Sequence, residues 1–200
     1  MPSKSLIIWK RSLSFHFSNW KTLLPIFPLL CLPVVGDVLH SLLIAQINQG
    51  KHLHPVQAVR EVWSYLPSVL GMKLYFEGAA LLWGFVPIYG IFRDIRHRLH
   101  WAMASNVLIF ENLSGEGGRD RCRELIQEAF PSGVRTLFTV PSLLLVGFLL
   151  VWVISGMFLD SLYFYGFWVL IVASFWIVIP GSGAANTFFY LQIRNKGIGS

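Results

Sequence analysis

Four long apolar runs dominate this sequence, and the charged residues collect between the second and the third of them. The runs cover residues 22–44, 66–92, 134–159 and 162–180. Each matches the roughly 20 residues that a helix needs to cross a bilayer. With 54% hydrophobic residues, 13% charged residues and a mean hydropathy of +0.59, the chain carries more apolar surface than a soluble domain of this length can bury. The sequence predicts a single all-α domain, an integral membrane helical bundle of about four transmembrane helices with additional interfacial amphipathic helices.

The segment 93–133 joins the second run to the third and is expected on the cytoplasmic side. The stretch from Arg93 to Arg135 holds 7 of the 16 Lys and Arg residues and 6 of the 10 Asp and Glu residues. Basic residues beside apolar spans mark the cytoplasmic face of a membrane. With both termini and this segment inside, thirteen basic residues are cytoplasmic and only Lys51 and Arg60 are outside. This bias predicts a protein of the bacterial cytoplasmic (inner) membrane with both termini cytoplasmic, and it favours four spans over six.

Two further stretches have the periodicity of amphipathic helices. Residues 5–20 place Leu6, Trp9, Leu13, Phe17 and Trp20 at spacings of three and four, which predicts an interfacial helix before the first crossing. A second such helix is expected from Arg119 to Phe130, ended by Pro131, with an apolar face of Cys122, Leu125, Ile126, Ala129 and Phe130. Between them, residues 101–110 form an apolar piece too short to span, which predicts a half-buried or re-entrant helix.

Three ionisable residues fall inside predicted crossings. Asp37 lies in the first apolar run, and Lys73 and Glu77 lie four residues apart in the second. A charge inside the bilayer costs a few kcal/mol unless it is paired or wetted, so such residues are candidates for function. Antiparallel neighbours would bring Asp37 and Lys73 to similar depth. We expect a cluster of Asp37, Lys73 and Glu77, either as a polar clasp between helices or as a site for a proton, an ion or a polar headgroup.

The arginines of the central segment are the candidates for contact with lipid headgroups or a partner: Arg96, Arg98, Arg119, Arg121 and Arg123. Membrane lipids are therefore the expected partners, with a membrane-protein partner or a homo-oligomer also possible. The formal net charge of +6 does not point to nucleic acid, since there is no basic stripe with interleaved aromatic residues.

Motifs for covalent or metal chemistry are missing from the sequence. His97 and His100 form one pair and His52 and His54 another, and neither has a third ligand at useful spacing. No phosphate loop, nucleophile elbow or catalytic triad is present. We therefore predict no metal, no cofactor and no catalytic residue, and an enzyme is the less favoured reading.

Two stretches carry a resemblance to a known family: the run VLIFENLSGEGGRDRCREL (Val107–Leu125) and the closing FFYLQIRNKG. They are similar to bacterial multi-span membrane proteins related to the membrane domain of glycerophosphodiester phosphodiesterases. In that pattern an acidic residue precedes a helix with an Arg-Ser pair, and the chain closes on Tyr-x-x-x-Arg. Here Glu111, Arg121 with Cys122, and Tyr190 with Arg194 correspond, with Cys122 in place of serine. The resemblance implies a multi-span helical domain without the phosphodiesterase chemistry, which resides in a separate soluble domain of such proteins.

These observations lead to one expected function and one alternative. The first is a non-enzymatic integral membrane protein that contacts lipid headgroups or a membrane partner through its cytoplasmic segment. The alternative is a small transporter or transporter subunit that uses the intramembrane cluster of Asp37, Lys73 and Glu77.

Overall fold

The structure is a computed structural model that describes residues 4–83, 89–139, 141–143, 146–147, 149–150, 153 and 178–197. Every element in these ranges is a helix, which confirms the all-α class for the described part of the chain. The elements are α1 (Lys4–Ser18), α2 (Trp20–Leu23), η1 (Leu24–Ile26), α3 (Phe27–Leu30), α4 (Pro33–Asn48), α5 (Pro55–Trp83), α6 (Tyr89–Glu111), α7 (Gly115–Val134), the π-helical η2 (Arg135–Thr139) and α10 (Ile179–Gly197).

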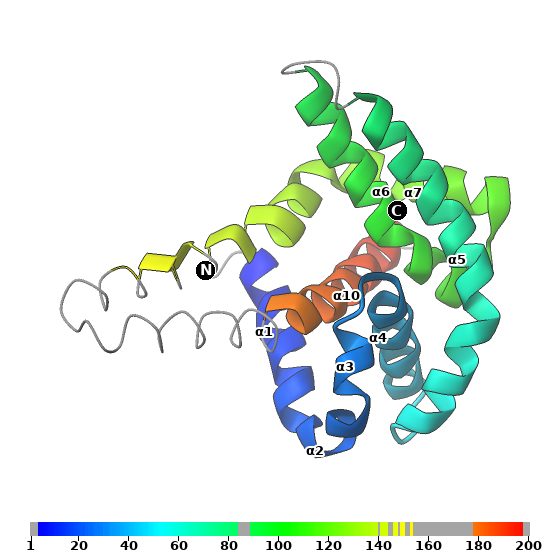
Figure 1. The fold of residues 1–200 in the computed structure, drawn as a ribbon, viewed down its shortest axis with the longest axis vertical. Helices are drawn as coiled ribbons and strands as arrows, with labels where there is room; N and C mark the ends of the chain where they lie inside the picture. Colours follow the sequence, from blue (N-terminus) through cyan, green and yellow to red (C-terminus); the bar gives the residue numbers. More distant parts are fainter. Residues whose placement is uncertain are drawn as a thin grey trace.

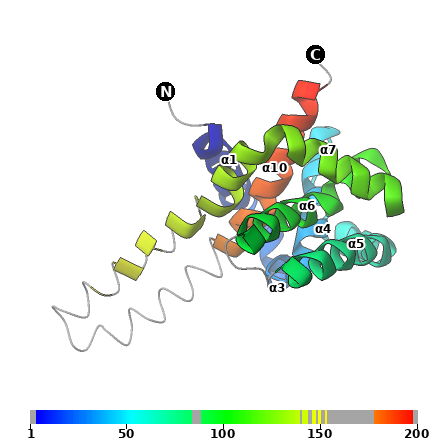
Figure 2. The same cartoon turned by 90° about the horizontal axis from the view of Figure 1, so that it is seen from above.

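The described helices pack into one body around α6 and α10. Helix α10 lies between α1 and α4, and in the perpendicular view α6 lies between α5 and α7 (Figures 1 and 2). Two buried hydrogen bonds tie α1 to distant parts of the chain. The Trp9 indole N–H donates to the Thr136 carbonyl oxygen over 2.9 Å, and the Ser12 hydroxyl donates to the Gly181 carbonyl oxygen over 2.6 Å. The N-terminal helix is therefore part of the packed body.

Prolines divide the first predicted crossing, residues 22–44, into four pieces. Pro25 and Pro28 stand at the starts of η1 and α3, and Pro33 begins α4. Leu32, immediately before Pro33, has the extended backbone (φ −77°, ψ 129°) that the proline ring imposes on its predecessor. Helix α4 ends at Asn48, and two residues later Gly50 has a left-handed φ of 69°. The first half of this run is therefore broken into short pieces, because each proline removes a donor from the helical ladder.

Helix α1 begins and ends near the predicted bounds of 5–20, but it buries a different face. Leu6, Phe17 and Trp20, which were expected on the apolar stripe facing the membrane interface, are exposed. The side chains that pack inward are Ser5, Ile8, Trp9, Ser12 and Phe15. Small hydroxyl side chains face the body because they reach backbone and side-chain partners there, as Ser12 does with Gly181.

The central segment is a core element of the body. Helix α6 is continuous from Tyr89 to Glu111, and residues 103–108 are all buried. Helix α7 buries Cys122, Leu125, Ile126 and Ala129, which confirms its predicted apolar face. Its bounds were predicted too narrowly: α7 begins at Gly115 and continues through Pro131 to Val134. Residues 101–110 are therefore more deeply buried than the half-buried helix that was predicted for them.

The described helices lack a clear membrane crossing. None of them combines the length and the apolar character that spanning a bilayer requires. The predicted crossings 134–159 and 162–180 lie mostly outside the described residues, as do residues 84–88 of the predicted second crossing.

Helix packing brings together segments that were predicted on different sides of a membrane. Helix α4 runs parallel to α10, since His40 lies against Gly183 and Ser41 against Thr187. At their C-terminal ends Asn48, expected outside, shares a pocket with Arg194, expected inside. On α5, Tyr75 lies in the middle of the predicted second crossing. Its ring centroid is 4.2 Å from the guanidinium carbon of Arg119. Segments assigned to the first two crossings and to the cytoplasm thus belong to the same packed body.

Candidate functional site

The structure brings together two of the three predicted intramembrane charges. Helices α4 and α5 pack side by side, and the Lys73 ammonium lies 2.5 Å from a carboxylate oxygen of Asp37. Lys73 is 2% exposed and Asp37 14% exposed, so the pair is shielded from the surroundings. Nothing is described of the Glu77 side chain, and its membership in the cluster stays a prediction.

A third partner of Lys73 comes from α6 and was not predicted. The Lys73 ammonium lies 3.5 Å from the ring centroid of Trp101, within the range of a cation–π interaction. Three helices therefore meet at one charge. The sequence around Trp101 does not predict its contact with Lys73, because it does not show which helix packs against this side of α6.

The ion pair borders a cavity of about 610 Å³. Its wall is mostly apolar, and Asp37, Arg98, Ser182 and Asn186 add polar groups. The Asn186 amide donates to the Ala102 carbonyl oxygen over 2.5 Å. Within the described part of the chain its own carbonyl oxygen has no hydrogen-bond partner, although the residue is only 5% exposed. The cavity can accept a largely apolar group that carries one hydrogen-bond donor.

The predicted headgroup arginines lie on two helices and have different surroundings. Arg119 and Arg123 of α7 both act on Tyr75 of α5: the first lies over its ring, and the second donates to its hydroxyl over 2.7 Å. Arg123 also pairs with Asp120 at 2.8 Å. Arg96 of α6 is half-buried, and Arg98 is exposed at the cavity just described. The five arginines therefore do not form one patch.

Arg121 joins a buried network that connects α6, α7 and α10. Its guanidinium donates to one carboxylate oxygen of Glu111 over 2.8 Å, and the Tyr190 hydroxyl donates to the other over 2.7 Å. The Tyr190 ring stacks on Phe110. Burial and the adjacent Glu111 raise the pKa of the Tyr190 hydroxyl, so it stays protonated and keeps its role as donor. Glu111, Arg121 and Tyr190 are the residues on which the family resemblance was stated.

The neighbouring cysteine is not a nucleophile. Cys122 is fully buried beside this network. Burial raises the pKa of its thiol to about 12, and the charge of Glu111 acts in the same direction. Because the reactive form is the thiolate, Cys122 behaves as a small apolar side chain.

His97 and His100 lie next to each other in a positive environment. Their ring centroids are 5.9 Å apart. Burial lowers the pKa of His100 to about 3, and His97, Arg96 and Arg123 add to the effect. Across the described ranges, no group of three or more possible metal ligands is found. A neutral His100 in a basic setting does not favour a metal site.

A second histidine pair was missed by the sequence reasoning. Nε2 of His16 lies 3.0 Å from Nε2 of His40. The two Nδ1 atoms face carbonyl oxygens, that of Ser12 at 2.9 Å and that of Gly36 at 2.7 Å. Two neutral rings carry two N–H protons, while these three contacts require three. Burial lowers the pKa of His16, which favours the neutral form of its ring. With both rings neutral, one of the three contacts has no proton between its two atoms.

Comparisons with known proteins identify no relative of this chain. No family model, no curated protein and no solved structure matches the chain.

Proposed function

We propose that this protein is a non-enzymatic integral membrane protein of the bacterial inner membrane. In this proposal its helical body rests against the cytoplasmic surface of the bilayer, and the apolar segment 140–177, which holds most of the third and fourth predicted crossings, enters the bilayer. Arg11 and Arg194 lie in the same pocket, which puts the first and last helices on one side. The excess of basic residues in the body favours the cytoplasmic side.

The observation that carries this proposal is a row of exposed apolar side chains after η2. The side chains of Leu143, Val146, Leu149, Leu150 and Val153 are all at least 43% exposed. In water such a row would be unfavourable by roughly 25 cal/mol per Å² of apolar surface, whereas lipid solvates it without penalty. The body carries exposed aromatic residues as well, among them Phe17, Trp20 and Trp63, which are typical of the bilayer interface.

Extraction of native membranes tests this proposal. Membranes from cells that express the protein are washed with alkaline carbonate and then with detergent. We expect the protein to remain in the membrane pellet after carbonate and to leave it only in detergent. Recovery of the folded chain in the carbonate supernatant would refute the membrane insertion.

The arginines of α7 are proposed to contact lipid headgroups. Arg119 and Arg123 stand beside Tyr75 at the surface of the body, where a basic residue near anionic lipid contributes about 1 kcal/mol. Flotation with vesicles that contain anionic lipid should weaken in the double variant Arg119→Gln with Arg123→Gln. The matched control Arg60→Gln removes an exposed charge from α5 and should bind as the wild type does. Equal binding by all three would exclude the arginine contact and leave a protein partner, which cross-linking in native membranes would reveal.

The alternative of a small transporter rests on the Asp37–Lys73 pair, because this pair borders a cavity. A shielded charge beside a cavity can bind and release a proton or a polar substrate. Reconstituted vesicles that show a flux abolished by Lys73→Met, with folding retained, would support transport. Loss of folding without any flux in the wild type would leave the pair as a clasp between helices.

The family resemblance also stays a proposal. Its support here is that Glu111, Arg121 and Tyr190, which are up to 79 positions apart, form one hydrogen-bonded unit. Glu111 is engaged on both oxygens and Cys122 is held as a thiol, which favours a structural role for this unit. Turnover of phospholipid by the purified protein would overturn the non-enzymatic proposal.

A further inference from the structure

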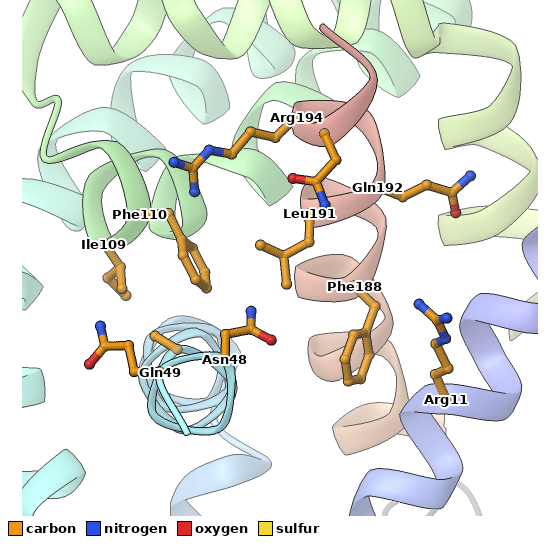
Figure 3. A pocket seen from close by; sticks show the side chains of 11 residues that line it. Arg11, Asn48, Gln49, Ile109, Phe110, Phe188, Leu191, Gln192 and Arg194 are labelled. Atoms are coloured by element: carbon orange, nitrogen blue, oxygen red, sulfur yellow. The ribbon is translucent and has the colours of Figure 1, made fainter. Parts of the chain in front are cut away.

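The pocket of about 710 Å³ between α1, α4, α6 and α10 offers no single binding point. Its two arginines, Arg11 and Arg194, lie on opposite sides of α10 (Figure 3). Its side-chain amides are mostly exposed. The cavity of about 610 Å³ beside the Asp37–Lys73 pair is different, because there a shielded polar group stands in a mostly apolar wall.

One oxygen of the Asp37 carboxylate is available to a ligand in this cavity. The Lys73 ammonium occupies the other oxygen, Oδ2, at 2.5 Å. Among the described residues Oδ1 has no hydrogen-bond partner, and it is not one of the fully enclosed polar atoms. The Lys73 ammonium in turn lies 3.5 Å from the ring centroid of Trp101, which also lines the cavity. These two short distances hold the carboxylate in place and put the indole ring close to it.

Hydrogen bonds inside the body already use several donors of the cavity wall. The Asn186 amide donates to the Ala102 carbonyl oxygen over 2.5 Å, and the Ser182 hydroxyl donates to the Val178 carbonyl oxygen over 2.6 Å. Acceptors remain available instead, first of all Oδ1 of Asp37. The wall therefore favours a ligand that donates a hydrogen bond over one that only accepts, such as an ether or a ketone.

The charges around the cavity favour an uncharged donor. Asp37 and Lys73 balance each other, and Arg98 adds a positive charge at the exposed rim. A ligand ammonium beside Asp37 would be repelled by Lys73, and a ligand carboxylate or phosphate would be repelled by Asp37. A hydroxyl group meets neither repulsion, and its hydrogen bond to a charged acceptor is stronger than one to a neutral acceptor.

The cavity lies where the proposed membrane segment joins the body. Leu137 and Phe138 precede residues 140–177, Val178 and Ile179 follow them, and all four line the cavity. With this segment in the bilayer, an apolar chain can reach the cavity from lipid. The volume lies within the range of small-molecule sites, about 300 to 1,000 Å³, which favours a lipid with one chain over a phospholipid with two.

We propose that this cavity binds an uncharged single-chain lipid alcohol, such as a monoacylglycerol or a long-chain alcohol, taken from the bilayer. The hydroxyl group of the ligand donates to Oδ1 of Asp37, and its chain lies along the apolar wall. The proposal rests on the proposed function for the source of the ligand. It also gives a ligand class to the cavity that the transporter alternative left without one.

Protection of Cys31 from a thiol reagent tests the proposal. Cys31 lines the cavity, whereas Cys122, the other cysteine of the sequence, is fully buried. The full-length protein in neutral detergent is treated with a small maleimide, and mass spectrometry of its peptides gives the rate of modification at Cys31. The probes are decanol and decyl methyl ether, which have the same chain and the same oxygen but differ in the hydroxyl proton.

Two variants separate the hydroxyl contact from the apolar wall. Asp37→Leu with Lys73→Met removes the acceptor together with its counter-charge, so no buried charge is left unpaired. Ser182→Leu narrows the cavity and leaves the ion pair in place. Its matched control is Ser64→Leu on the exposed face of α5, because Ser64 also donates to a carbonyl oxygen of its own helix. Melting temperatures are measured alongside, and the two variants alter different helices, so one misfolded variant leaves the other informative.

We expect decanol to protect Cys31 of the wild type saturably, with an affinity about tenfold higher than that of the ether. In the double variant both probes should protect equally. Protection by decanol should weaken in Ser182→Leu and stay unchanged in Ser64→Leu. No saturable protection of the wild type, or equal protection by the two probes, would overturn the proposal.

Failure of this proposal can be told apart from failure of the proposed function. Carbonate extraction reports whether the chain is inserted in the membrane, and Cys31 protection in detergent reports whether the cavity is occupied. A protein that leaves the membrane in carbonate but still prefers decanol would refute the insertion and support the site. An inserted protein that shows no preference for decanol would refute the site alone.

Discussion

Lys73 shows how single residues organise the polar interior of this protein. Its ammonium is almost fully enclosed, yet Asp37 and Trp101 both contact it. A buried charge is tolerated only when such partners replace its hydration. The pairing with Asp37 could be predicted, because two charges at similar depth on neighbouring helices attract each other. Trp101 could not, because the rotation of α6 depends on packing along its whole length.

Removing one partner of this pair should destabilise the protein strongly. We expect Lys73→Met to lower the free energy of unfolding by about 3–5 kcal/mol, because the Asp37 carboxylate is left without its counter-charge. The double variant Asp37→Leu with Lys73→Met should regain most of that loss. Chemical unfolding in detergent measures both. A double variant as unstable as the single one would mean that the Trp101 contact, rather than the ion pair, carries the stability.

His100 makes stability depend on pH. Its folded-state pKa is about 3, while that of an unfolded histidine is about 6.5. As pH falls through this window, the unfolded chain binds a proton that the folded chain excludes, so stability is full above pH 6.5 and is lost below it.

The variant His100→Phe should remove the contribution of His100 to this dependence. Neither ring nitrogen of His100 has a hydrogen-bond partner among the described residues, so an aromatic ring of similar shape can replace it. At pH 5 we expect His100→Phe to be more stable than the wild type by up to about 2 kcal/mol, and nearly equal at pH 7. Melting curves at the two pH values provide the measurement. His52→Phe, in an exposed loop position, is the control and should leave the pH profile unchanged.

At the scale of elements, close packing depends on α10. Its residues Gly181 and Gly183 lie against Trp9 and His40, and Ala184 and Ala185 are fully buried. The small residues from Gly181 to Ala185 let α10 approach its neighbours closely. Which helices approach was not predictable, because small side chains specify a distance but not a partner.

A methyl group at Gly183 should therefore be destabilising. The Cβ of an alanine there would lie 2.6 Å from Nδ1 of His40, and the buried ring has no room to move. We expect Gly183→Ala to lower the free energy of unfolding by about 1–3 kcal/mol. The control is Gly117→Ala in α7, which meets open space and should be neutral or stabilising by up to about 1 kcal/mol. Equal effects of the two substitutions in a melting assay would contradict the close contact between α4 and α10.

At the scale of the whole molecule, the ends of the apolar segment 140–177 return to the same place. Leu137 and Phe138 of η2 and Ile179 of α10 line the same cavity. Residues on both sides of the segment thus belong to the body. Because they lie at the same cavity, a short linker can join them in place of the segment. This separates a helical body from the part of the chain proposed to enter lipid.

Replacing residues 141–177 by a short glycine-serine linker should keep the body folded. We expect retained helical circular dichroism and a cooperative melting transition, because buried side chains of α1, α4, α6, α7 and α10 pack on one another in a shared core. The variant should also leave membranes in alkaline carbonate, unlike the wild type. An unfolded variant would contradict the independence of the body, and a folded variant that still resists carbonate would place the membrane anchor in the body itself.

The sequence by itself determined the helical class and the local features of individual helices: the apolar face of α7, the breaks at Pro25, Pro28 and Pro33, and the small residues of α10. These follow from spacing and backbone chemistry within a few residues. The tertiary structure alone decided that α4 lies beside α10, that α5 packs on the α7 arginines and that the first helix, α1, packs on the last, α10. Hydropathy treats each apolar run as a separate crossing, whereas the position of a helix depends on side chains far away in the sequence that compete for the same buried faces.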